Sequence, residues 1–184
     1  MATFISILRG INVSGHRKVR MAELKNLYED AGFMDVKTYI QSGNVIFEAP
    51  ARVSGQAIAG KLEKAIYTRY GFEIPVIIRT LVQLQQLISS NPFLKTDHIN
   101  TEKLHVTFLS QKPAPQETKN LENYRYPPDA FILKGEDVFL HCPDTYGNTK
   151  LSNKFFENKL KVKATTRNWK TINKLVALAG DGSI

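Results

Sequence analysis

The spacing of hydrophobic residues divides the first half of the chain into short strands and two amphipathic helices. Apolar residues that alternate with polar ones predict strands, whereas apolar residues three or four positions apart predict helices. Gly32 and Gly71 follow the two helical patterns, as is typical of helix ends. The predicted elements are strand 3–8, helix 21–31, strands 36–40 and 44–48, helix 57–70 and strand 72–79. Residues 1–80 therefore show the order β-α-β-β-α-β.

The second half repeats this order of elements. A short helix over 81–90, which the Asn91-Pro92 pair ends, separates the two halves. The elements predicted after it are strand 104–109, a helix near 116–124, strands 130–133 and 138–141, a helix around 151–158, strand 160–164 and a last helix that begins at Trp169. Since no repeat of individual residues connects the halves, the repetition is one of architecture.

Two β-α-β-β-α-β units predict an α+β protein made of two tandem ferredoxin-like halves plus a C-terminal helix. The expected domains are 1–80 and 103–180, with a helical linker at 81–102. Crossover connections are right-handed, so strands one and two of a unit run in the same direction and end at the same edge of the sheet. We therefore expect loop 9–18 to meet the hairpin turn at 41–44. By the same logic, loop 143–149 should meet residues 165–168 in the second half.

The last predicted helix begins with the only tryptophan of the chain, Trp169. Trp169 shares an apolar stripe with Ile172 and Val176, Asn168 is suited to the N-cap, and Gly180 fits the left-handed position after the helix. One interpretation is an anion site made by the helix N-terminus with Arg167 beside it. The other is an ordinary capped helix, in which the tryptophan fills the core and the arginine pairs with a carboxylate.

The positive charge of the chain is concentrated near its C-terminal end. The formal net charge is +8, and residues 146–180 contribute +7 of it through eight basic residues and a single acid, Glu157. The eight basic residues are Lys150, Lys154, Lys159, Lys161, Lys163, Arg167, Lys170 and Lys174. Such a concentration allows binding to nucleic acid or another polyanion.

Composition excludes several classes of protein. The hydrophobic fraction of 42% and the charged fraction of 23% are those of a globular protein. A lone cysteine, Cys142, excludes an internal disulfide framework and suits a reducing compartment. No stretch has the composition of a signal peptide or of a membrane span, so we expect a cytoplasmic protein without a membrane partner. The four histidines lack the spacing of metal ligands, so we expect no metal and no cofactor.

The loop at 9–18 resembles a phosphate-binding P-loop only in part. Gly10 and Gly15 have the P-loop spacing, but His16 and Arg17 occupy the positions where a P-loop needs lysine and then serine or threonine. Nucleotide hydrolysis is therefore disfavoured. The loop is nevertheless basic, and its glycines allow a ligand to approach the backbone closely.

Three stretches of the chain resemble the signatures of a mainly bacterial family that is known only as a domain of unknown function. They are Leu8-Arg-Gly-Ile-Asn-Val-Ser-Gly15, Tyr39-Ile-Gln-Ser-Gly-Asn-Val45 and Thr166-Arg-Asn-Trp-Lys-Thr-Ile-Asn-Lys-Leu175. Ser14 departs from the pattern, where a glycine is expected. The resemblance implies a compact two-part α+β fold in a bacterial, cytoplasmic protein. It implies no activity, cofactor or catalytic residue.

These observations favour a protein that binds an anionic ligand, either nucleic acid or a phosphorylated compound. Two other classes stay open: a metal-independent enzyme acting on a phosphorylated small molecule, and a protein-interaction module with an acidic partner. In the enzyme, Asn12, Gln41, Asn44 or Tyr146 would polarise the substrate. The oligomeric state does not follow from the sequence. The residues that we expect to bind the ligand are Arg9, Asn12, Lys18, Gln41, Asn44, Tyr146, Lys150, Arg167, Asn168 and Lys174.

Overall fold

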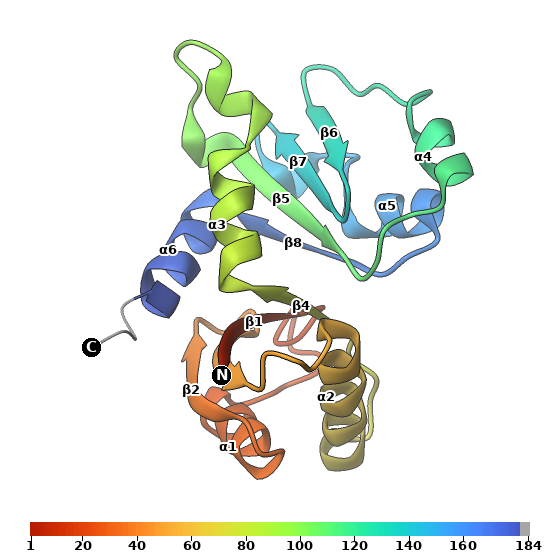
Figure 1. Ribbon diagram of the computed structural model, residues 1–184. Coiled ribbons are helices and arrows are strands. Elements are labelled where there is room, and N and C mark those ends of the chain that lie inside the picture. The colour runs from red at the N-terminus through yellow and green to blue at the C-terminus, as the bar shows by residue number, and fades with distance from the viewer. Residues whose placement is uncertain (181–184) are drawn as a thin grey trace. The chain divides into compact units, whose positions relative to one another are not determined.

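The computed structural model describes residues 1–180, which form two compact units (Figure 1). Unit 1 comprises residues 1–86 and 174–180, and unit 2 comprises residues 87–173. Each unit contains one four-stranded sheet. The expected domains at 1–80 and 103–180, with a linker at 81–102, stay a prediction.

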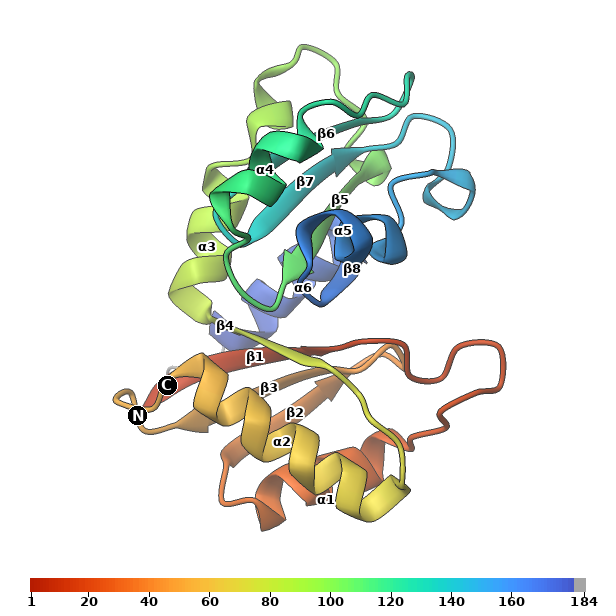
Figure 2. The same ribbon diagram turned by 90° about the vertical axis from the view of Figure 1, so that its right-hand side faces the viewer.

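Unit 1 has the ferredoxin-like topology that the hydrophobic pattern predicts. Its elements are β1 (Ala2–Leu8), α1 (Met21–Asp30), β2 (Met34–Tyr39), β3 (Asn44–Ala49), α2 (Gly55–Tyr70) and β4 (Val76–Thr80). The sheet order is β2-β3-β1-β4, and neighbouring strands are antiparallel. Figure 2 shows α1 and α2 together on one face of this sheet.

Unit 2 repeats the topology. Its elements, with the helix α3 that leads into it and the helix α6 that leaves it, are α3 (Leu81–Ser89), η1 (Pro92–Lys95), η2 (Thr101–Lys103), β5 (Leu104–Leu109), α4 (Pro115–Leu121), β6 (Ala130–Lys134), β7 (Asp137–His141), η3 (Tyr146–Asn148), α5 (Asn153–Leu160), β8 (Ala164–Asn168) and α6 (Trp169–Gly180). The sheet order is β6-β7-β5-β8, again antiparallel between neighbours. The predicted α+β fold of two ferredoxin-like halves with a C-terminal helix is confirmed.

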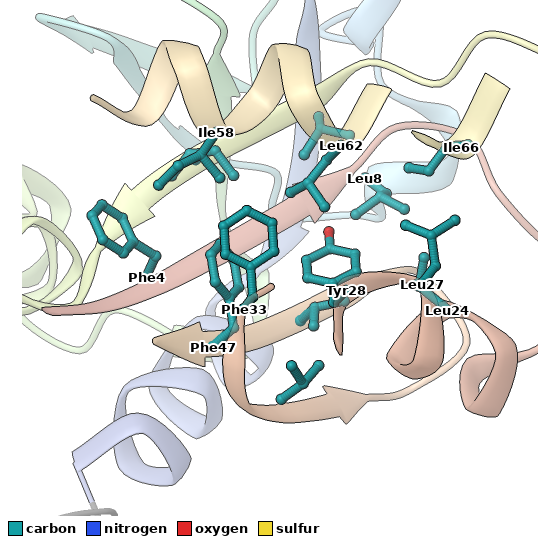
Figure 3. Packing of buried hydrophobic residues seen from close by; sticks show 14 of the residues in the cluster. Phe4, Leu8, Leu24, Leu27, Tyr28, Phe33, Phe47, Ile58, Leu62 and Ile66 are labelled. Carbon is teal, nitrogen blue, oxygen red and sulfur yellow. The ribbon is translucent and has the colours of Figure 1, made fainter. Parts of the chain in front are cut away.

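An aromatic cluster fills the core of unit 1 between the sheet and its two helices (Figure 3). The ring centroids of Phe33 and Phe47 lie 4.8 Å apart, and Tyr28 meets Phe47 edge-on at 5.3 Å. The hydroxyl of Tyr28 is completely buried and forms a 2.6 Å hydrogen bond with Oγ of Ser6 on β1. This bond satisfies two polar groups that would otherwise be costly to bury.

Tyr28→Phe is expected to lower the free energy of unfolding by about 1 kcal/mol at pH 8, because it removes this hydrogen bond. Burial raises the pKa of Tyr28, so the folded protein keeps a proton that the unfolded chain releases above about pH 10. The native protein should therefore lose stability as the pH rises through that range, at up to about 1.4 kcal/mol per pH unit. Urea denaturation of both proteins at several pH values measures this difference. A constant gap between them from pH 8 to pH 11 would contradict it.

One predicted strand is placed wrongly. Residues 160–164 were expected to be a basic strand, whereas Leu160 ends α5, Lys161 follows with φ 57° in the left-handed region, and β8 begins only at Ala164. Leu160, Val162 and Ala164 are all buried in the core of unit 2. A helix end followed by a tight turn has thus placed alternate residues in the core, which imitates the period of a strand.

The C-terminal helix also differs from prediction at its end. Gly180 is the last residue of α6 and does not have the positive φ of a left-handed cap. The positions that follow lie outside the described residues. No helix within residues 1–180 is both long enough and apolar enough to cross a bilayer.

Candidate functional site

Loop 9–18 and the turn at 41–44 meet in unit 1, as the topology predicts. The backbone N–H of Leu8 donates to the carbonyl of Gly43 at 2.8 Å, and Nδ2 of Asn12 donates to the carbonyl of Gln41 at 2.9 Å. Gly43 makes this approach possible, because a Cβ at this position would lie 2.7 Å from Cδ1 of Ile11. The expected juxtaposition of the two segments is confirmed.

Asn12 holds the loop in a defined conformation. Its Nδ2 also donates to the carbonyl of Val19, and its Oδ1 accepts from the N–H of Val19, both at 2.9 Å. Between these anchors the chain turns back on itself, with Val13 and His16 forming an antiparallel bridge. The side chain of Asn12 is therefore engaged within the protein, while Lys18 beyond it is exposed.

The other predicted residues of unit 1 differ in accessibility. Asn44 is completely buried, and its Nδ2 donates to the carbonyl of Tyr39 and to Oγ of Ser42. Arg9 is half-buried, with its backbone N–H bonded to the carbonyl of Pro75, whereas Gln41 is exposed. Asn44 thus stabilises the turn from inside, and a ligand would meet Arg9, Lys18 and Gln41.

In unit 2, loop 143–149 lies against the end of β8, again as expected. The ring of Tyr146 stacks on the ring of His105 with centroids 4.7 Å apart, and His105 on β5 is paired with Asn168 on β8. Oδ1 of Asn168 accepts from the N–H of Thr171 at 2.8 Å, which confirms the predicted N-cap. Tyr146 and Asn168 therefore share one end of this sheet.

His105 was not predicted as a site residue. Burial lowers its pKa, so its imidazole is largely neutral at pH 7. Nδ1 is buried and makes no hydrogen bond within the described part of the chain. The nearby backbone of Lys103 acts against burial and raises the pKa of His105. The only sequence signal would have been an isolated histidine on a predicted strand, which is too weak to single it out.

Arg167 is nearly enclosed, with 9% of its surface exposed. Its Nη1 donates to Oγ1 of Thr165 at 3.0 Å and to the carbonyl of Thr166 at 2.9 Å. Burial lowers its pKa to about 10, and Tyr146 acts in the opposite direction. The guanidinium therefore stays charged at neutral pH, and a ligand could reach only its edge.

Two threonine hydroxyls and an asparagine amide form a chain of hydrogen bonds between β5, β8 and α5. Oγ1 of Thr107 and Oγ1 of Thr166 lie 2.7 Å apart, and Thr166 donates to Oδ1 of Asn153 at 2.6 Å. Asn153 is the first residue of α5, so these bonds connect the start of α5 to the middle of β8. Lys154, the next residue of α5 after Asn153, is exposed.

The exposed lysines of the basic C-terminal segment, residues 146–180, are not neutralised by acids. Six lysines of residues 146–180 are exposed, and none of them forms an ion pair with a described residue. They are Lys150, Lys154, Lys161, Lys163, Lys170 and Lys174. The only acid of the segment, Glu157, accepts a hydrogen bond from the N–H of Ala164 at 3.1 Å.

The fold separates these lysines into two groups. Lys161 and Lys163 precede β8, where the N–H of Ser110 donates to the carbonyl of Lys163. Lys170 follows β8, beside Asn168 at the opposite end of the strand. Five strand residues span roughly 15 Å, so the two groups lie at different ends of the sheet. Lys174, one turn further along α6, belongs to the part of the chain that packs with unit 1.

Lys150 lies over the ring of Tyr126, with its Nζ 5.4 Å from the ring centroid. It lines a cavity of about 230 Å³ that also contains Asp129 and Asp144. Nearby, burial raises the pKa of Cys142 to about 11, with the charge of Asp129 as a second cause. The thiol is therefore protonated at neutral pH and is a poor nucleophile. Within residues 1–180, no group of three or more His, Cys, Asp or Glu side chains could hold a metal ion.

The two units share a repeat of individual residues that the hydrophobic pattern of the sequence does not reveal. The first residue of the fourth strand donates its N–H to a glutamate of the preceding helix: Val76 to Glu63 at 2.9 Å, and Ala164 to Glu157 at 3.1 Å. Three positions later stands a buried arginine, whose Nη1 donates to the preceding carbonyl at 2.9 Å in both units.

These arginines are Arg79 and Arg167, with 4% and 9% of their surfaces exposed. The residue after each arginine, Thr80 or Asn168, accepts a hydrogen bond from the N–H three positions on, at the start of the next helix. The equivalent positions of Arg79 and Arg167 indicate that both belong to a duplicated structural motif.

Comparison with known proteins agrees with this architecture. The solved structure of the conserved bacterial protein SP0830 from Streptococcus pneumoniae is similar in fold, with a TM-score of 0.78 at 24% sequence identity, covering 98% of this chain and 99% of that chain. None of the curated proteins compared with the chain matches it. The family described as "Protein of unknown function (DUF1697)" matches residues 1–139. The chain therefore belongs to this family of proteins of unknown function.

Proposed function

We propose that this protein binds a phosphate-bearing anion through basic residues of unit 2. The observation that supports it is the set of exposed lysines without ion pairs. Charges that are exposed and unpaired create a positive potential, which attracts anions and raises their local concentration. A fold needs no such accumulation for its stability, because like charges repel one another.

The end of the sheet that contains Asn168 is the better candidate for the binding surface. Lys170 lies in the first turn of α6, where the helix dipole adds to the positive potential. The half-buried ring of Tyr146 is stacked on His105 at the same end, and an aromatic ring is a surface on which a base can stack. A lysine in the first turn of α6 and a stacked aromatic pair at the same end of the sheet suit a ligand that has both phosphate and a base.

An acidic residue in the same loop limits the strength of this surface. Asp144 is exposed two residues before Tyr146, and Nζ of Lys103 donates to the backbone carbonyl of Asp144 at 2.7 Å. Lys103 thus brings a cation to the backbone of the loop that contains Asp144.

The experiment is a salt titration of binding to single-stranded and duplex nucleic acid and to mononucleotides. Two double variants separate the two ends of β8: Lys154→Gln/Lys170→Gln and Lys161→Gln/Lys163→Gln. Lys37→Gln/Arg52→Gln is the matched control, since both residues are exposed in unit 1 and the net charge changes equally. Log affinity should fall linearly with log salt, by about 0.7–0.9 for each phosphate contact.

We expect Lys154→Gln/Lys170→Gln to reduce this slope by about 1.4–1.8 and the other two variants to leave it nearly unchanged. Equal losses in all three variants would mean that only net charge matters, which contradicts a site at Asn168. Failure to bind any nucleic acid at about 50 mM salt would contradict the nucleic-acid ligand, because electrostatic attraction is strong there. Tight binding of a mononucleotide with weak binding of the polymer would assign the surface to a small phosphorylated ligand.

A further inference from the structure

We propose that residues 9–20 of unit 1 form a second, separate contact for nucleic acid, which binds the phosphodiester backbone. These residues are called the basic hairpin below. The site lies in unit 1 and does not depend on the surface proposed in unit 2. It uses Arg17 and Lys18, which are exposed on a fixed turn.

The basic hairpin accounts for the net charge of the N-terminal part of the chain. It contains Arg9, Arg17, Lys18 and Arg20 and no acid, which is a charge of +4 with His16 neutral. Residues 1–86 contain eleven basic and seven acidic side chains, so the rest of this stretch is balanced. The net charge of residues 1–86 therefore lies in 12 residues, a shorter stretch than the 35 residues of 146–180 that carry +7.

Three of the four charged side chains of the hairpin are exposed, while apolar residues fix its two ends. Ile11 and Val19 are each only 2% exposed, whereas His16, Arg17, Lys18 and Arg20 are all exposed. Arg20 has a weak partner, since its Nη1 lies 3.8 Å from Oε1 of Glu23 at a largely exposed position. Arg17 and Lys18 form no ion pair with any residue of the described chain. They are therefore the available cations.

The backbone of the hairpin is held in a conformation that few residues adopt without support. Asn12, Ser14 and Arg17 have φ values of 55°, 50° and 47°, and Gly15 has 77°. Consecutive positive φ values at Ser14 and Gly15 are those of a tight type I′ turn. The N–H of Asn12 donates to the carbonyl of Arg17 at 3.2 Å, and the side chain of Asn12 bonds to Val19 and Gln41. Such conformations are kept where the surrounding structure imposes them, often at functional sites.

A fixed hairpin of this kind suits nucleic acid. A two-stranded ribbon fits the major groove of DNA, and the planar fork of an arginine matches the geometry of a phosphate. A rigid loop also loses less conformational entropy on binding than a mobile one. The hairpin is less suited to membrane insertion, because Val13 is its only exposed apolar side chain and stable membrane anchoring needs a larger apolar area.

The test measures binding of the full chain to a 20-nucleotide single strand and to the corresponding duplex across a range of salt concentrations. Arg17→Gln/Lys18→Gln removes the two charges, and Lys37→Gln/Arg52→Gln is again the matched control. Loss of two phosphate contacts should lower the affinity roughly 100-fold at about 50 mM salt and reduce the salt slope by about 1.4–1.8. Circular dichroism confirms that each variant is folded.

Asn12→Ala keeps every charge and removes the three hydrogen bonds of its side chain. We expect a roughly three- to ten-fold loss of affinity with an unchanged salt slope, because the charges remain and only their arrangement loosens. An unchanged affinity in folded Asn12→Ala would overturn the role of the fixed turn. An affinity of Arg17→Gln/Lys18→Gln equal to that of the control would overturn the contact itself.

The same titrations separate this site from the one in unit 2. If only the hairpin variant loses affinity, the basic hairpin stands and the proposed site at Asn168 fails. If only Lys154→Gln/Lys170→Gln loses affinity, the hairpin inference fails. Vesicles of anionic phospholipid serve as a further ligand. If Arg17→Gln/Lys18→Gln weakens vesicle binding and leaves nucleic-acid binding unchanged, the hairpin contacts membranes and the inference is overturned.

Discussion

Trp169→Ala is expected to lower the free energy of unfolding by about 3–5 kcal/mol, the usual cost of deleting a buried tryptophan side chain. Only 7% of Trp169 is exposed. It begins α6, on the same helix face as Ile172, Leu175 and Ala179, which are also buried. Alanine would leave a cavity that neighbouring side chains fill only in part, and the lost dispersion contacts add to the lost burial.

Urea denaturation followed by circular dichroism measures this effect, with the slope m checked for two-state behaviour. Lys170→Ala is the matched control, because this side chain is exposed in the same turn and its loss should change stability by no more than about 0.5 kcal/mol. A cost below about 1 kcal/mol for Trp169→Ala would mean that the ring contributes little to the core. It would then favour a role for the indole in ligand binding.

Gly43→Ala should cost about 2–5 kcal/mol, through two separate effects. The φ of Gly43 is +80°, a left-handed conformation that costs an alanine roughly 1–2 kcal/mol. An added Cβ would also lie 2.7 Å from Cδ1 of Ile11 and 2.8 Å from Cβ of Leu8. Relief of that overlap requires movement of the backbone or of two buried side chains, which typically costs about 1–3 kcal/mol.

Gly71→Ala separates the two effects. Gly71 has a similar φ of +74°, but a Cβ there would have no heavy atom within 4 Å. Its cost should therefore be only the conformational part, about 1–2 kcal/mol. Equal destabilisation in the two variants would contradict steric exclusion at Gly43. A larger loss in Gly43→Ala would also be expected to loosen the basic hairpin, since Leu8 and Ile11 support its base.

Local patterns were sufficient for the element order and for much of the topology. Short runs of mostly apolar residues placed β1, β3 and β5 within about one residue of their observed bounds, because strands that are buried along most of their length need apolar side chains at most positions. The handedness of crossovers then brought loop 9–18 to Gln41 and loop 143–149 to Asn168. Both results rest on chain connectivity, which is fully present in the sequence.

Local patterns gave a wrong prediction where a helix end and a turn produce the same hydrophobic periodicity as a strand. At 160–164 a helix end and a turn placed Leu160, Val162 and Ala164 in the core as a strand would have done. The consequence reached the candidate site, because Lys161 and Lys163 lie at the opposite end of β8 from Asn168. The distribution of charge along the sequence does not show this separation of the lysines, since the two ends of a five-residue strand lie roughly 15 Å apart.

What the sequence by itself determined about this protein is the architecture, the burial of Trp169, the cap at Asn168 and the two meeting places of loops. Each follows from local periodicity, cap chemistry or connectivity. Tertiary structure decided the roles of the polar residues. Asn44, Arg79 and Arg167 are buried polar side chains. No local sequence pattern predicts their burial, because it depends on partners elsewhere in the fold. The repeat that relates Arg79 to Arg167 became visible for the same reason: the arginine and the cap have the same spacing in both units, but the glutamate that bonds to the start of the strand lies at a different distance along the chain in each.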